Sequence, residues 1–236
     1  MTLSNDIMKD MIDVYFRDLA KEFKRLTGRK AKAEIIVVGG ASILLNYDFR
    51  MNSIDIDAFT NYKNIIECAA KKIADKYQLS QQWFNDDFTK TTSYSSKLRQ
   101  YSIYYKTFGN VIEVRTIRRE YLIAMKMMSG RKYKNDLSDI LGILYQHYME
   151  KDEITYNEIE QAIINLYGKL DEIDKEITEF VKNAIKNRSF IDGYNTQKQN
   201  EKNIRDALIQ YQKENTNNKI SNNVDNILDI LNSHNN

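Results

Sequence analysis

The chain has 236 residues, of which 42% are hydrophobic and 29% charged, so it can form a sizeable folded core. Its net charge of +2 is too small to indicate a nucleic-acid-binding protein by itself, and no apolar run approaches the ~20 residues that a membrane span needs. The N-terminus has acids where a signal peptide needs bases, and the single cysteine excludes an internal disulfide. We therefore expect a cytoplasmic protein that does not bind a membrane.

The first half of the chain is expected to alternate helices and strands. Helices are predicted where apolar residues recur every three or four positions, and strands where β-branched and aromatic residues cluster. In chain order, the expected elements are a helix over 4–26 with Ser4 as its N-cap, a strand over 34–38, a short helix over 41–45, a strand over 54–59, a helix to Tyr77 capped by Asn61, loops around a short strand over 80–100, and hairpin strands over 101–107 and 111–117.

The second half is expected to be helical. The apolar periodicity predicts helices over 118–129, 135–148, 155–167, 171–187 and 201–213. The fold class predicted from this order is α+β, with a small mixed β-sheet flanked by helices and a helical C-terminal region. The expected divisions are a catalytic domain over 1–150, a helical region over 151–215 and a polar tail over 216–236 that could carry a short helix.

Two short motifs between residues 34 and 59 carry the candidate chemistry. Gly39 and Gly40 join a strand to a helix, where the backbone can approach a ligand and offer N–H groups to a phosphate, with the hydroxyl of Ser42 as a further donor. Asp55 and Asp57 share one face of the next strand, roughly 7 Å apart. Two carboxylates that close repel each other, and a divalent cation such as Mg²⁺ would relieve that repulsion.

The order of these motifs, VVGGAS followed by SIDIDAF, resembles the nucleotidyltransferase superfamily. Further along, WFND at 83–86 and YLIAMKMMSGRKYKNDLSDILGIL at 121–144 resemble uncharacterised bacterial nucleotidyltransferases related to the AbiEii/MenT toxin group. The resemblance covers roughly 30–145. It implies a nucleotidyltransferase-type sheet and an Mg²⁺-dependent enzyme that moves a nucleoside monophosphate from a nucleoside triphosphate (NTP) to an acceptor hydroxyl.

The resemblance also implies roles for individual residues. Glu113, set between two apolar strand residues, would be a third metal ligand or a general base, although an exposed charge on a hairpin is an equally open interpretation. Asp136 would be catalytic or simply a helix N-cap, and Asp139 would orient a neighbouring cation. The implied catalytic residues are Asp55, Asp57, Glu113, Lys126 and Asp136; the metal ligands are Asp55, Asp57 and Glu113; and the nucleotide-binding residues are Gly39, Gly40, Ser42, Arg50 and Arg131.

The acceptor is less well defined by the sequence. Seven basic residues against one acid between Arg115 and Lys134 favour a nucleic acid, although they could equally serve the triphosphate alone. The toxin resemblance points to tRNA and to a cognate antitoxin protein as a partner. A protein hydroxyl or a small molecule such as an aminoglycoside is an alternative acceptor. The alternative of a different class is a non-catalytic module that binds a nucleotide or a partner protein.

Overall fold

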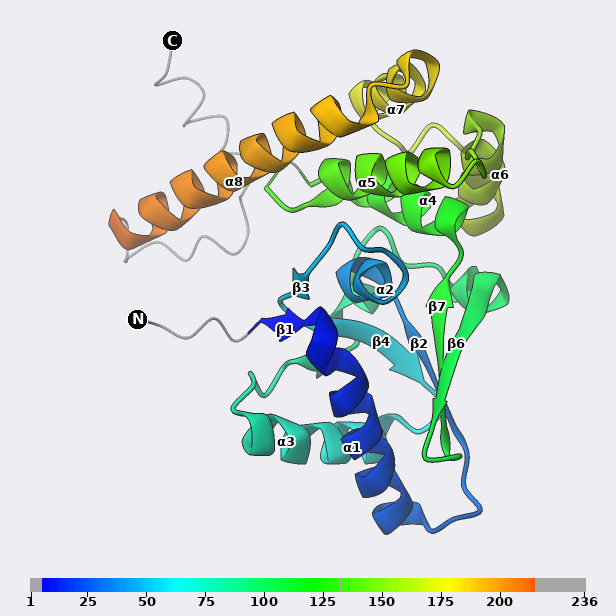
Figure 1. Cartoon of the computed structure of the whole chain (residues 1–236), viewed down its shortest axis with the longest axis vertical. Helices are drawn as coiled ribbons and strands as arrows, with labels where there is room; N and C mark the ends of the chain where they lie inside the picture. The colour runs from blue at the N-terminus through cyan, green and yellow to red at the C-terminus, as the bar shows by residue number, and fades with distance from the viewer. Residues whose placement is uncertain (1–5, 132, 215–236) are drawn as a thin grey trace.

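A five-stranded mixed β-sheet forms the centre of the structure, a computed structural model that describes residues 6–131 and 133–214 (Figure 1). The strands lie in the order β5-β4-β2-β7-β6. β2 pairs antiparallel with β4 and parallel with β7, β4 pairs parallel with β5, and β6 and β7 form the expected antiparallel hairpin. The strand bounds are β2 Ala33–Val37, β4 Ile56–Thr60, β5 Phe84–Asn85, β6 Ser102–Phe108 and β7 Ile112–Ile117.

Two helices from the first half of the chain cover one face of this sheet. They are α1, Lys9–Thr27, and α3, Lys63–Tyr77. Their apolar stripes bury Phe16, Phe23 and Ile66 against Trp83 and the side chains of Ile35 and Val37 from β2, which together form the core on this face. β2 is apolar on both sides because its intervening residue, Ile36, packs in the core on the other face.

The remaining helices comprise a short one, with Ala41 and Leu44 in the core under α1 and α3 and Ile43 in the core on the other face, and a group that lies over that other face. They are α2 Gly39–Asn46, α4 Arg119–Ser129, α5 Asp136–Met149, α6 Tyr156–Tyr167, α7 Lys175–Asn187 and α8 Phe190–Glu214, and α4–α8 are stacked above the sheet in Figure 1. α6 packs on α4 and α8 packs on α5, so the helices on both sides of residue 150 form one layer. In the described part of the chain, no helix is both long and apolar enough to cross a membrane.

The expected α+β fold class is confirmed, but several boundaries differ. α1 begins at Lys9, because Ile7–Met8 form a strand, β1, that pairs with Asn52–Ser53, β3; Ser4 lies outside the described residues. Asn61 does not cap α3, because its side-chain oxygen accepts the backbone N–H of Glu34 instead. The polar segment over 192–200 is helical, as the first part of α8. The tail over 216–236 also lies outside the described residues.

Candidate active site

A cleft of about 850 Å³ opens beside the first turn of α2, which is large enough for a nucleotide-sized ligand. Seven basic and three acidic side chains contribute to its wall. The lining residues come from the residue before β1, the first turn of α2, the segment from Arg50 to β4, α4, the turn before α5, and α8. They are Asp6, Gly40, Arg50, Asn52, Ser53, Ile54, Asp55, Asp57, Lys126, Arg131, Lys134, Asn135, Asn195, Lys198, Gln199, Lys202 and Arg205.

The two carboxylates of the Asp-x-Asp motif lie together at this cleft. Asp55 directly precedes β4 and Asp57 lies within it, while Ile56 between them points to the opposite core. Burial and the neighbouring Asp55 carboxylate raise the pKa of Asp57 to about 6, although Lys134 and Arg131 act against this rise. A cation between the carboxylates would favour their ionised forms.

The glycine pair allows close approach at the first turn of α2. Gly39 has a φ of +59°, and a Cβ atom there would lie 3.6 Å from Oδ2 of Asp57. A Cβ atom on Gly40 would lie 2.8 Å from Nη2 of Arg50 and 3.1 Å from Oγ of Ser53. The first N–H groups of a helix have no intrahelical acceptor, so this turn offers phosphate donors directly beside the carboxylate pair.

A chain of alternating charges forms the floor of the cleft. Nζ of Lys126 lies 2.8 Å from Oδ1 of Asp136 and 2.7 Å from Oδ2 of Asp139. Arg131 donates from Nε to Asp136 at 3.0 Å, and Arg50 donates to Asp139. Burial opposes ionisation of Asp136, but the Lys126 and Arg131 cations hold its pKa below the usual range. Three cations balanced by two carboxylates leave this floor with a net positive charge.

The structure brings most of the expected residues together. Gly40, Arg50, Asp55, Asp57, Lys126 and Arg131 line the cleft. Gly39 lies beside the Asp57 carboxylate, and Asp136 is fully buried beneath Lys126. Asp139, expected to orient Lys126 or Arg131, binds Lys126 and also pairs with Arg50.

Ser42 and Glu113 do not reach the cleft. Ser42 is fully buried, and its hydroxyl accepts the backbone N–H of Ile117 at 3.2 Å, so it does not face a phosphate at the cleft. Glu113 pairs in register with Glu34 and accepts a hydrogen bond from Arg115 at 2.8 Å.

The sheet register explains the position of Glu113. Val38 lies beside Asp57, and the β2–β7 register continued to Val38 places Ile117 next to it. Glu113 is therefore four residues away along β7, about 13 Å, and the neighbouring strand presents an apolar side chain where a third carboxylate was expected.

Several cleft residues were not identified as site residues from the sequence. Lys134, in the turn before α5, has a pKa lowered by burial and by the Arg131 cation. α8 contributes Lys198, Lys202 and Arg205, which recur at spacings of four and three and so share one face of the helix. The helix predicted over 201–213 included Lys202 and Arg205, but the polar surroundings of Lys198 gave no reason to extend that helix toward residue 190.

The carboxylate pair fits a magnesium ion better than a metal held entirely by protein. Among the residues that the structure describes, no three acidic, histidine or cysteine side chains form a group suited to a metal. Mg²⁺ is commonly bound through one or two carboxylates together with substrate phosphates and water. Asp55 and Asp57 would hold it, with the donors of the α2 first turn beside it for the phosphates.

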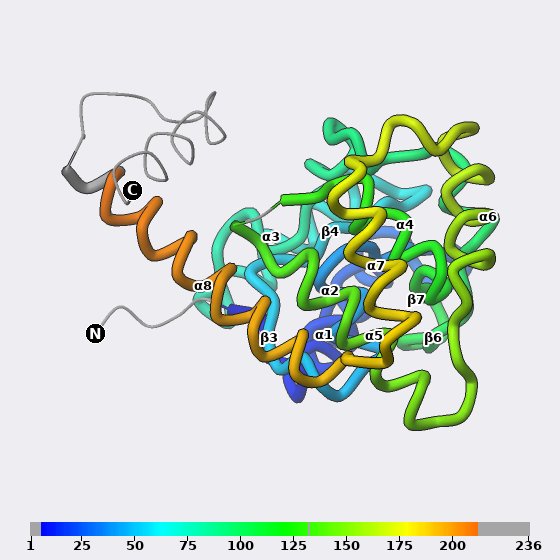
Figure 2. The backbone as a smooth tube through the Cα atoms, turned by 90° about the horizontal axis from the view of Figure 1, so that it is seen from above, coloured from blue at the N-terminus to red at the C-terminus, as the bar shows by residue number. Residues whose placement is uncertain are grey.

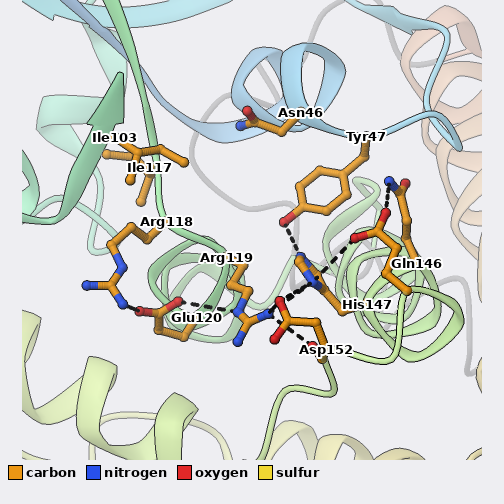
Figure 3. A pocket seen from close by; sticks show the side chains of 11 residues that line it. Asn46, Tyr47, Ile103, Ile117, Arg118, Arg119, Glu120, Gln146, His147 and Asp152 are labelled. Atoms are coloured by element: carbon orange, nitrogen blue, oxygen red, sulfur yellow. Dashed lines mark hydrogen bonds and ion pairs between the residues drawn. The ribbon is translucent and has the colours of Figure 1, made fainter. Parts of the chain in front are cut away.

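A second, smaller pocket of about 390 Å³ lies at the opposite end of α2 (Figure 3). Its charged and polar side chains bind one another: the Tyr47 hydroxyl lies 3.2 Å from Nε2 of His147, and Arg119 lies 3.1 Å from Nδ1 of the same ring. Arg118 pairs with Glu120 at 2.8 Å. This pocket has internally paired charges and lacks the carboxylate pair and glycines of the larger cleft, which is therefore the candidate active site.

Comparison with known proteins identifies the family of the chain. A family model described as "Nucleotidyltransferase of unknown function (DUF6036)" matches residues 15–174, which include the glycine pair, both aspartates and the charge network on α4 and α5. No curated protein and no solved structure gives a significant match. Helix α8 lies beyond the matched residues.

Proposed function

The chain belongs to the family of nucleotidyltransferases of unknown function that matches residues 15–174, and we propose that it moves a nucleoside monophosphate from ATP or another NTP to an acceptor hydroxyl with Mg²⁺. In this reaction the acceptor oxygen bonds to the α-phosphorus with loss of its proton, and the bond to the leaving pyrophosphate breaks. One observation carries the proposal: Asp57 lies against Gly39 at the start of α2, so cation ligands and phosphate donors meet at one point.

The residues of the cleft divide into three roles. Asp55 and Asp57 hold the metal, which supplies charge neutralisation for the triphosphate. The first turn of α2 binds phosphate oxygens through N–H groups that the missing side chains of Gly39 and Gly40 leave accessible. Arg131 and Lys134 lie close enough to Asp57 to affect its pKa, and they stabilise the negative charge on the leaving pyrophosphate.

RNA, such as the end of a tRNA, is the acceptor that we favour. The excess of basic over acidic side chains around the cleft supports a polyanionic acceptor, and a small neutral acceptor would not need it. The resemblance to the AbiEii/MenT toxin group supports the same acceptor and adds a cognate antitoxin protein as a proposed partner. The RNA acceptor and the antitoxin partner are both part of the proposal.

Replacing Asp57 tests the reaction. Wild-type protein, incubated with Mg²⁺, cell RNA and each α-labelled NTP, is expected to transfer label to RNA. Asp57→Asn should lower the transfer rate by 10² or more, because an amide oxygen is a poor ligand for Mg²⁺ and the carboxylate pair is lost. Chelation of the metal should have the same effect as the substitution.

Two variants make the test specific. Asp171→Asn removes a carboxylate that is 77% exposed, outside the cleft, and should leave transfer unchanged. Glu113→Gln should also retain activity, because Glu113 lies about four residues along β7 from the site. Label transfer by Asp57→Asn at the wild-type rate would refute the assignment. A wild-type protein that binds NTP without transferring it would indicate a non-catalytic binding module.

A further inference from the structure

Helix α8 meets α5 through a buried carboxylate. Glu201 is only 1% exposed, and one of its oxygens accepts the backbone N–H groups of Leu137 at 3.0 Å and Ser138 at 3.1 Å. Its other oxygen accepts the hydroxyl of Ser138. These N–H groups belong to the first turn of α5, whose own N-cap residue, Asn135, provides no side-chain cap. Glu201 therefore caps α5 from a neighbouring helix.

The capped turn is the one that organises the floor of the cleft. Asp136 and Asp139, which belong to this turn, hold the cations of the charge network. A cap holds the first turn of a helix in its helical conformation. Because this cap comes from α8, Glu201 also fixes the position of α8 relative to those carboxylates. Arg205 adds a longer contact, 3.5 Å from its Nη1 to the side-chain oxygen of Asn135.

The face of α8 adjacent to Glu201 forms a wall of the cleft. Its lining residues are Asn195, Lys198, Gln199, Lys202 and Arg205, which include three cations and no acid. α8 crosses over α5, and its C-terminal half extends away from the other helices (Figures 1 and 2). Because α8 lies outside the residues matched by the family model, this wall is not accounted for by family membership.

We propose that Glu201 is a positioning residue that, by capping α5 from α8, holds Lys198, Lys202 and Arg205 at the cleft, where they bind phosphate groups of a substrate. The identity of the substrate rests on the proposed function. Phosphates could come from the backbone of an RNA acceptor or from the triphosphate of the NTP, and the same three cations would serve either.

Binding measurements with two probes test this role. The probes are a short fluorescein-labelled single-stranded RNA and a fluorescent ATP analogue with Mg²⁺. The triple variant Lys198→Ala/Lys202→Ala/Arg205→Ala should weaken RNA binding about tenfold or more and reduce the slope of log affinity against log salt by about 2. A loss confined to RNA assigns the cations to the acceptor, a loss confined to the ATP analogue assigns them to the triphosphate, and no loss with either probe overturns the proposal.

Variants of Glu201 test the positioning itself. Glu201→Leu should weaken the same probe by a similar factor, while Glu201→Gln should stay within about twofold of wild type because its amide oxygen still accepts the α5 N–H groups. Glu201→Leu added to the triple variant should cause little further loss, since the cations it positions are already gone. Glu201→Ala, which leaves room for water at these N–H groups, replaces Glu201→Leu should that variant not fold.

Controls separate positioning from general effects. Lys175→Ala/Lys182→Ala/Lys186→Ala removes the same charge from α7, away from the cleft, and should leave the affinity near that of wild type. Unchanged binding by Glu201→Leu, full additivity with the triple variant, or an equal loss in the α7 control would each overturn the proposal. These assays need no turnover, so a failure to detect transfer would count against the proposed function and leave this inference standing.

Discussion

The ammonium group of Lys126 forms ion pairs mainly within the protein. Its ammonium group is buried and contacts both Asp136 and Asp139, which leaves one of its three N–H donors for a phosphate. The sequence suggested a catalytic lysine, and the structure adds a structural task, because the two carboxylates depend on it. A buried pair of carboxylates without its cation is one of the costliest arrangements that a substitution can produce.

We predict that Lys126→Met destabilises the protein by about 3–5 kcal/mol, because it leaves Asp136 and Asp139 buried with less compensation. Urea denaturation measures the change. Lys202→Met, at an exposed lysine of the same cleft, is the matched control and should change the free energy of unfolding by less than about 0.5 kcal/mol. A cost below about 1 kcal/mol for Lys126→Met would contradict the ion-pair interpretation.

The pH dependence of this variant follows from the same contacts. The pKa of Asp136 is lowered in the folded state, so the ionised carboxylate stabilises the wild type above its ordinary pKa of 3.8, and that stability is lost as the pH falls. In Lys126→Met the carboxylates are penalised when ionised and relieved when protonated. The stability gap between variant and wild type should therefore narrow in acid.

At the scale of residues, local patterns predicted which side chains of the Gly-Gly and Asp-x-Asp motifs lie together at the cleft, but not where Glu113 and Ser42 lie. Gly39, Gly40, Asp55 and Asp57 lie within one short segment, and their closeness follows from a strand ending in a helix beside the next strand. The position of Glu113 depends instead on how β7 aligns with β2, which no local pattern contains. The orientation of Ser42 was not predictable for a similar reason, because the rotation of α2 about its axis decides which of its side chains face the cleft.

Among the elements, α8 was the hardest to anticipate. Its face against α5 carries Gly193, next to Leu141, and Glu201, which accepts the N–H groups of Leu137 and Ser138, and neither is a large apolar residue. An adjacent face lines a cleft and is polar for that reason. A helix between a polar contact and a polar cleft lacks a strong apolar stripe, so its periodicity predicted only its last part, over 201–213.

The segment that carries Arg50 depends on a close contact with α5. A Cβ atom on Gly142 would lie 2.5 Å from the ring of Phe49, which also packs against Tyr194 of α8 at a centroid distance of 5.7 Å. Glycine in a helix costs about 1 kcal/mol relative to alanine, so its presence in α5 needs a compensating reason. The Phe49 ring supplies that reason.

We predict that Gly142→Ala destabilises the protein by about 1–3 kcal/mol despite the better helix propensity of alanine, because the Phe49 ring must move. Chemical denaturation measures the change. Gly193→Ala in α8 is the matched control: its Cβ would lie 3.1 Å from a methyl carbon of Leu141, a milder contact, so the change should stay within about 1 kcal/mol. Equal effects of the two substitutions would show that the contact with Phe49 is not limiting.

For the whole molecule, the sheet separates two cores that must act together. One core lies under α1 and α3, and the other joins the sheet to α4–α7. Neighbouring residues of β2 contribute to different cores, Ile35 and Val37 to the first and Ile36 to the second. The sequence suggested a boundary near residue 150 because the strands end before it. The packing of α6 on α4 and of α8 on α5 crosses that position.

This arrangement predicts a single cooperative unfolding transition. The protein has one tryptophan, Trp83, fully buried in the core under α1 and α3, so its fluorescence reports that core. Helices α4–α8 dominate the far-ultraviolet circular dichroism and surround the other core. Because β2 belongs to both, the urea transitions measured by the two signals should coincide, which is the test of two-state behaviour.

A substitution in one core sharpens this test. Ile159 of α6 is fully buried in the core opposite Trp83, and Ile159→Ala should cost about 2–5 kcal/mol through lost burial and the cavity left behind. If the sheet couples the cores, the tryptophan transition must shift to lower urea by as much as the circular dichroism transition, although Ile159 and Trp83 lie in different cores. A shift seen by circular dichroism alone would mean that the helical layer unfolds independently, and α8 could then leave the cleft without unfolding the sheet that carries Asp57.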